Sequence, residues 1–230
     1  MAQQAGWLSP STGEMPKGQR GSVIINMYIA EQLKKKSVAE YLLYMWQVED
    51  TLRAYGLDVE RMAVEYVPQF GLDAEKSEAL KGWYESLVEM MREEGVTERG
   101  HLQVNKNIII LLSDLHRQLL KSSKHPMYAA MYYKVLPFIV ELRGKRRPSP
   151  QPSPVNGEGD HAERKSFENK PDDPKGEIEN CFEALYGVML LRAQKKEVSV
   201  ETATAIDNIA KFVGMLSEYY KKEKEGELEL

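Results

Sequence analysis

The residues between Ser37 and Gly56 form a predicted helix that is apolar on two faces. Ser37 can cap its start, and Gly56 suits the left-handed residue that ends many helices. A helix with two apolar faces contacts neighbours on both sides, which predicts a multi-helix bundle with this helix near its centre. The apolar residues of the two faces are Val38, Tyr41, Met45, Val48 and Leu52, and Ala39, Leu42, Leu43 and Trp46.

The rest of the chain carries the same helical periodicity and no sustained alternation typical of strands. We therefore predict an all-α fold, a single bundle of about seven or eight helices. Asp73 is the predicted N-cap of a long helix that ends at Gly95, Thr97 of the next one, and Ser199 of the last. The expected helices besides the one at 38–55 span about 28–36, 59–67, 74–94, 98–120, 126–144, 177–195 and 200–222.

Two segments break the periodicity. Residues 1–26 are rich in Gly, Ser, Gln and Pro, and residues 145–175 contain a run in which Pro alternates with Ser or Gln. Neither has enough large apolar residues to offset the loss of chain entropy on folding, so both are predicted to be disordered. The bundle would then consist of residues 27–144 and 176–225, interrupted by a disordered insertion and followed by a flexible tail at 226–230.

Composition excludes several classes of protein. The net charge is −4 and the basic residues are spread along the chain, which argues against a nucleic-acid partner. No apolar run approaches the roughly 18 residues that span a bilayer, and the N-terminus lacks the pattern of a signal peptide, so we expect no membrane association and a cytoplasmic location. The single cysteine, Cys181, lies in an apolar stretch and is interpreted as a buried structural thiol.

Two polar residues, Asn105 and His116, interrupt the apolar face of the helix expected at 98–120. His101, Asn105 and His116 lie on one arc with leucines 112, 115 and 119. Such residues most often satisfy their hydrogen bonds inside the core and fix helix register. The alternatives that stay open are a ligand pocket and, less favoured, a catalytic role.

Asp50 raises the same question on the helix at 38–55, because it lies close to the stripe that includes Leu43 and Trp46. Glu49 and Arg53 are spaced i, i+4 and predict a local ion pair beside that stripe. Asp50 has no such local base, so it is expected to find a partner elsewhere or to face water.

Motifs for catalysis or metal binding are incomplete. The Glu98-x-x-His101 spacing occurs once, whereas di-metal sites in helical bundles need two such motifs and further glutamates. No phosphate-binding glycine loop, nucleophile elbow or His-Glu-x-x-His motif is present. We therefore expect no catalytic residues, no metal and no cofactor.

Five stretches of the sequence resemble a bacterial family of domains of unknown function: 29–33, 39–50, 100–107, 136–143 and 184–191. The resemblance runs from Met27 to the C-terminus apart from the Pro-rich insertion. It implies a helical domain of uncharacterised activity and supplies no catalytic residues.

The leading functional expectation is a non-enzymatic interaction or scaffold protein that self-associates or binds a helical protein, because no catalytic set is complete and tyrosines are plentiful. The alternative is a protein that binds a small ligand or nucleotide, with hydrolysis as one version of it. Its pocket would lie near Asp50, Asn105 and His116, with His101 as a further ligand-binding candidate.

Overall fold

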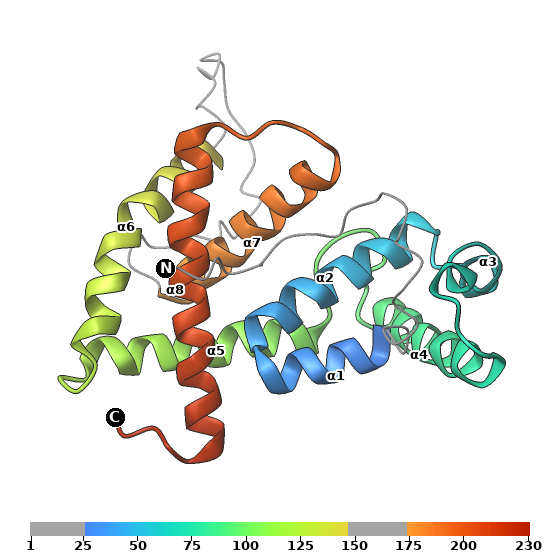
Figure 1. Ribbon diagram of the computed structural model, residues 1–230, viewed down its shortest axis with the longest axis horizontal. Helices are drawn as coiled ribbons and strands as arrows, with labels where there is room; N and C mark the ends of the chain where they lie inside the picture. Colours follow the sequence, from blue (N-terminus) through green and yellow to red (C-terminus); the bar gives the residue numbers. More distant parts are fainter. Residues whose placement is uncertain (1–25, 147–173) are drawn as a thin grey trace, which may run out of the picture.

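The fold is entirely helical in the part of the chain that the computed structural model describes, residues 26–146 and 174–230 (Figure 1). Eight α-helices, one 3-10 helix and no strand occur in these residues, which confirms the predicted fold class. The helices are α1 (Asn26–Lys36), α2 (Val38–Ala54), α3 (Val59–Glu65), η1 (Val67–Phe70), α4 (Ala74–Glu93), α5 (Gln103–Lys121), α6 (Pro126–Arg146), α7 (Pro174–Ala193) and α8 (Val200–Glu225).

Most helix boundaries follow from capping chemistry. The side chains of Ser37, Asp73 and Ser199 each accept a hydrogen bond from the backbone N–H three residues later, which confirms three predicted N-caps. Gly56 and Gly95 follow α2 and α4 with φ of 68° and 67°, a conformation that favours glycine. The prediction for Thr97 is wrong, because α5 begins only at Gln103 and its N-cap residue is Leu102, which has no capping side chain.

The predicted disordered segments lie outside the described residues, except at their edges. Asn26 is the first residue of α1, α6 continues to Arg146, and α7 starts at Pro174. These helices therefore extend one or two residues into the segments predicted to be disordered.

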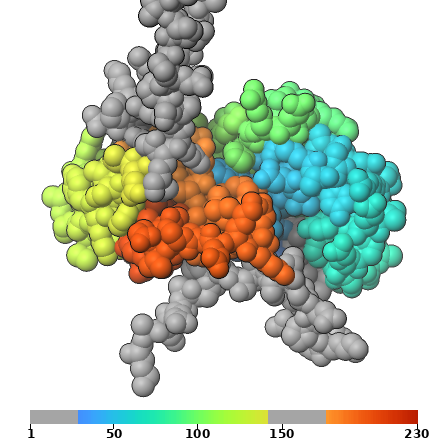
Figure 2. Space-filling view, turned by 90° about the horizontal axis from the view of Figure 1, so that it is seen from above, coloured from blue at the N-terminus to red at the C-terminus, as the bar shows by residue number. Residues whose placement is uncertain are grey.

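Helix α2 lies among the other helices of the bundle, as its two apolar faces predict. It contacts α1, α4, α5, α7 and α8, and ten of its 17 residues are buried. Helix α7 packs against α5 and α8, and α6 packs against α8. In the space-filling view, α6 lies at one end of the molecule and α2 to α4 lie at the other (Figure 2). Helices α2, α5 and α7 all contact one another. The candidate site lies where the first turn of α5 and the middle of α2 meet close to α7.

The last residues contact the start of α6. The sequence predicts a flexible tail at 226–230, and α8 does end before Gly226, which has a φ of 73°. His125 then donates a hydrogen bond of 2.7 Å from Nε2 to the carbonyl oxygen of Glu229, while Leu228 packs against the core. In the described residues no helix combines the length and apolar character that crossing a membrane requires.

Candidate functional site

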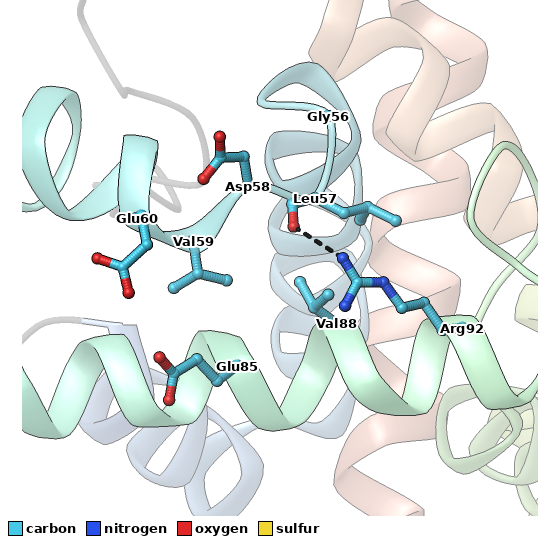
Figure 3. Close-up of a pocket in the computed structure, with 8 residues that line it drawn as sticks. All are labelled: Gly56, Leu57, Asp58, Val59, Glu60, Glu85, Val88 and Arg92. Carbon is cyan, nitrogen blue, oxygen red and sulfur yellow. Dashed lines mark hydrogen bonds between the residues drawn. The ribbon is translucent and has the colours of Figure 1, made fainter.

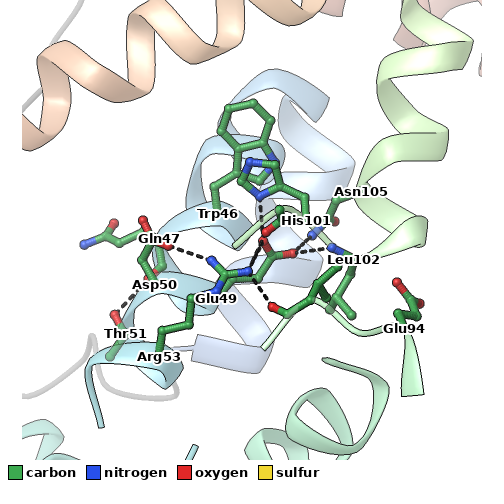
Figure 4. Close-up of polar contacts among 12 residues, drawn as sticks. Trp46, Gln47, Glu49, Asp50, Thr51, Arg53, Glu94, His101, Leu102 and Asn105 are labelled. Atoms are coloured by element: carbon green, nitrogen blue, oxygen red, sulfur yellow. Dashed lines mark hydrogen bonds and ion pairs between the residues drawn. The ribbon is translucent and has the colours of Figure 1, made fainter. Parts of the chain in front are cut away.

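A buried carboxylate is the centre of the candidate site. Glu49, on α2, is completely buried. Its Oε1 accepts hydrogen bonds from the Leu102 backbone N–H at 3.1 Å and from Asn105 Nδ2 at 2.7 Å. Its Oε2 lies 2.6 Å from His101 Nδ1 and 3.9 Å from Arg53 Nη2 (Figure 4). Four groups that can donate a hydrogen bond or carry positive charge thus surround the Glu49 carboxylate. Their interactions offset the free-energy cost of burying it.

The buried carboxylate of Glu49 caps the start of α5. The first backbone N–H groups of a helix have no partner within the helix, and the helix dipole favours a negative charge there. Leu102 has no side-chain oxygen to cap them, and two glutamates from other parts of the chain accept these bonds instead. Glu49 accepts the N–H of Leu102, and Glu94, just after α4, accepts the N–H of Gln103 at 2.6 Å.

Arg53 connects this carboxylate to its surroundings. Its Nη1 donates to Asp50 Oδ1 at 2.7 Å, and its Nη2 donates to the carbonyl oxygens of Val96 and Gly100. Tyr186, on α7, donates its hydroxyl to Asp50 Oδ2 at 2.6 Å. Burial and the hydrogen bond to Asp50 raise the pKa of the Tyr186 phenol, so it remains a donor at neutral pH.

These side chains line a cavity of about 370 Å³ between α2, the loop before α5, and α7. We call it the α2–α7 cavity. Its lining consists of Trp46, Asp50, Arg53, Glu98, Arg99, Gly100, His101, Glu183, Tyr186 and Gly187. The imidazole of His101 stacks on the indole of Trp46, with 4.0 Å between ring centroids and 10° between planes, so one face of the imidazole is covered and its orientation is fixed (Figure 4).

The structure brings three of the four predicted site residues together. Asp50 and His101 line the α2–α7 cavity, and Asn105 lies behind them, bound to Glu49. Asp50 does have a local base, contrary to expectation, because Arg53 one turn later pairs with it more closely than with Glu49. The Asp50 side chain is 42% exposed, whereas Glu49, its neighbour, is the buried residue.

His116 lies apart from this cavity, three turns further along α5 in the aromatic core. It is completely buried, and its Nδ1 lies 2.6 Å from the Tyr128 hydroxyl. Its Nε2 lies 4.0 Å from Glu177 Oε2, too far for a hydrogen bond, and that oxygen already accepts a bond of 2.7 Å from Tyr132. Burial dominates and lowers the pKa of His116 to about 4, so the imidazole is neutral at pH 7.

Two residues of the site were missed from the sequence. Glu49 was assigned to an ion pair beside the apolar stripe, although Leu42, Met45 and Leu52 lie seven and four residues before it and three after it on one face. That spacing was a signal for its burial. Tyr186 gave no such signal, because it is 136 residues from Asp50 in the sequence.

A second cavity, of about 380 Å³, lies between the turn after α2 and the middle of α4 (Figure 3). Three carboxylates, of Asp58, Glu60 and Glu85, contribute to its lining, and Arg92 donates a long hydrogen bond of 3.5 Å to the carbonyl oxygen of Leu57. Within the described residues, no group of three or more His, Cys, Asp or Glu side chains is arranged to hold a metal ion.

Comparison with known proteins gives one match. The sequence profile of the DUF4924 family, a domain of unknown function, matches residues 27–153 and 163–227. This confirms the resemblance seen in the sequence and extends it into the Pro-rich segment, of which only residues 154–162 fall outside. No match was found among curated proteins or among solved structures. Because the family match spans most of the chain, the protein belongs to the DUF4924 family.

Proposed function

We propose that the protein binds a small polar molecule in the α2–α7 cavity. One observation carries this proposal: half of the ten residues that line the cavity are ionisable Asp, Glu or Arg side chains. Two of them are held in place by their partners, Arg53 by Glu49 and two carbonyl oxygens, and Asp50 by Tyr186. The volume of the cavity is in the range of ligand pockets, and polar groups held in fixed positions are what orient a ligand in such pockets.

The charges of the lining favour a neutral or cationic ligand. Asp50, Glu98 and Glu183 contribute three carboxylates, against the two guanidinium groups of Arg53 and Arg99. Arg53 is already bound to Asp50 and to two backbone carbonyls. A ligand with several negative charges would meet net repulsion at this lining, whereas an uncharged or singly positive one would not.

Filling the cavity should abolish binding without unfolding the protein. A Cβ added at Gly187 meets no atom within 4 Å, and its backbone does not have positive φ, so the backbone and Cβ of Gly187→Leu are accommodated without strain and the rest of the side chain extends into open space beside the cavity. Replacing a helix-interior glycine should raise stability by up to about 1 kcal/mol. The measurement is a thermal-shift screen of the full chain and of Gly187→Leu against small neutral, cationic and anionic metabolites.

Gly82→Leu is the matched control, because Gly82 lies in α4 away from the cavity and also has open space around its Cβ. We expect a neutral or cationic metabolite to raise the Tm of the wild-type protein and of Gly82→Leu saturably, and to leave that of Gly187→Leu unchanged. An equal shift in all three proteins would show that the ligand binds elsewhere. A screen without any saturable shift would count against the proposal.

A second candidate function is self-association through α6, and an apolar surface favours it. Met127, Tyr133 and Val140 are 71%, 65% and 58% exposed. Tyr133 and Val140 are seven residues apart, two helical turns, so they share one face of α6. A second copy of this chain would bury the same face on both partners.

Light scattering coupled to size-exclusion chromatography tests this second candidate. We expect an oligomer at micromolar concentration that Tyr133→Glu converts to a monomer, since a charge at the contact would remain without a partner. Val64→Glu is the control, because Val64 is 76% exposed but lies on α3. A wild-type monomer, or an oligomer unaffected by Tyr133→Glu, would contradict it.

A further inference from the structure

Glu49 and His101 form a pair with the geometry of a carboxylate that orients a general base. Oε1 of Glu49 accepts hydrogen bonds from the Leu102 N–H and from Asn105, and Arg53 Nη2 lies 3.9 Å from Oε2. A carboxylate only accepts hydrogen bonds, so at the 2.6 Å contact His101 Nδ1 is the donor. In the neutral imidazole, Nε2 therefore carries the lone pair.

That nitrogen is on the accessible side of the pair. His101 lines the α2–α7 cavity, 27% of its side-chain surface is exposed, and no described group forms a hydrogen bond with Nε2. Stacking on Trp46 prevents the ring from turning. The other two histidines described differ from it: His116 is sealed in the core, and His125 uses Nε2 to bind the Glu229 carbonyl.

We propose that His101 is the general base of an ester hydrolase site, with Glu49 as its positioning residue. In this step Nε2 takes a proton from a water molecule while the water oxygen attacks the ester carbonyl carbon. The tetrahedral oxyanion then collapses, the bond to the alcohol oxygen breaks, and Nε2–H returns the proton to that oxygen. The products are a carboxylic acid and an alcohol, and His101 regains its starting form.

The neighbouring charges fit this chemistry. The Glu49 carboxylate stabilises the imidazolium that forms during the step, and the guanidinium of Arg99, which lines the same cavity, supplies positive charge for the oxyanion. The proposal rests on ligand binding in the α2–α7 cavity, and the excess of carboxylates there specifies a neutral or cationic ester. An anionic phosphate ester is the matched negative probe.

Hydrolysis of p-nitrophenyl acetate by the full chain, with p-nitrophenyl phosphate alongside, tests the proposal. We expect turnover of the acetate alone. His101→Gln should lower kcat/KM about 100-fold or more, since general base catalysis contributes factors of about 10² to 10⁴. His125→Gln, which alters a histidine outside the cavity, should keep the wild-type rate, and Gly187→Leu should lose it.

Glu49→Gln separates positioning from a purely structural role. The amide keeps an oxygen for Leu102 and Asn105 and places an NH₂ group where Oε2 accepts from His101. Nδ1 then becomes the acceptor, and the proton moves to Nε2. We expect long-range ¹H–¹⁵N spectra to show Nδ1–H in the wild type and Nε2–H in this variant, with kcat lowered about 10-fold or more and KM unchanged.

Two results would overturn the proposal. One is an Nε2–H tautomer of His101 in the wild-type protein, a measurement that needs no variant to fold. The other is acetate hydrolysis that is equally fast in the wild type and in His101→Gln. If a metabolite still raises the Tm in a Gly187-sensitive way, that second result removes the hydrolase site and leaves ligand binding intact. Without such a shift, both proposals fail together.

Discussion

Replacement of Glu49 with alanine should lower the free energy of unfolding by about 3–5 kcal/mol, the range typical of breaking a buried charged network by removing one partner. The variant leaves Asn105 Nδ2 and the Leu102 N–H without their acceptor, and Arg53 and His101 without the carboxylate that faces them. Buried donors without partners keep their full desolvation cost. Urea denaturation at pH 7, followed by circular dichroism, measures the loss.

Two other substitutions serve as comparisons for Glu49→Ala. Glu49→Gln retains an acceptor for Leu102 and Asn105 and should therefore destabilise the protein less than alanine does. Glu89→Ala removes an exposed glutamate of α4 and should stay within about 0.5 kcal/mol of the wild type. A Glu49→Ala variant as stable as Glu89→Ala would mean that the network contributes little to folding.

Acidification from pH 7 to pH 4 should remove about 3 kcal/mol of stability through His116 alone. Burial lowers its pKa in the folded protein to about 4, whereas the ordinary value is 6.5. Between these two values the unfolded chain binds a proton that the folded protein does not, so stability falls as pH falls through this window and levels off below about pH 4. The magnitude follows from about 1.4 kcal/mol for each pKa unit.

The difference between two proteins isolates this contribution from that of the carboxylates. Free energies of unfolding of the wild type and of His116→Gln, measured at pH 7, 5.5 and 4, should diverge in their pH dependence, with the steeper loss in the wild type. Parallel curves would show that the Glu177 carboxylate, 4.0 Å from Nε2, compensates for burial. His125→Gln, at a half-buried histidine outside the aromatic core, is the matched control variant.

Helices were predictable here because their signals are local. The caps at Ser37, Asp73 and Ser199 depend on residues within one turn, and the burial of α2 follows from the spacing of its apolar residues. The N-cap prediction for Thr97 is wrong because the groups that cap a helix can also come from elsewhere in the chain. The carboxylates of Glu49 and Glu94 cap the start of α5, and the residues around Thr97 give no indication of these distant partners.

Part of the candidate site was also predictable from local patterns. Asp50, His101 and Asn105 were identified as polar residues close to apolar stripes, and the structure gathers them around Glu49. Because α2 is apolar on two faces, Asp50 follows the stripe of Leu43 and Trp46, while Glu49, 100° away, shares the face of Leu42, Met45 and Leu52. His116 satisfies the same pattern yet lies in another part of the core, since position along a helix decides which neighbours a residue meets.

The capping of α5 by carboxylates from other helices has a consequence for motion. A helix capped by its own side chain can fray at its first turn without disturbing the rest of the protein. Here the bonds that hold the backbone of Leu102 and Gln103 end on Glu49 of α2 and on Glu94 after α4. Opening of the first turn of α5 therefore requires that the bonds to both of these segments break. Motion of the cavity wall formed by residues 98–101 is therefore coupled to α2 and to the end of α4, and not only to fraying within α5.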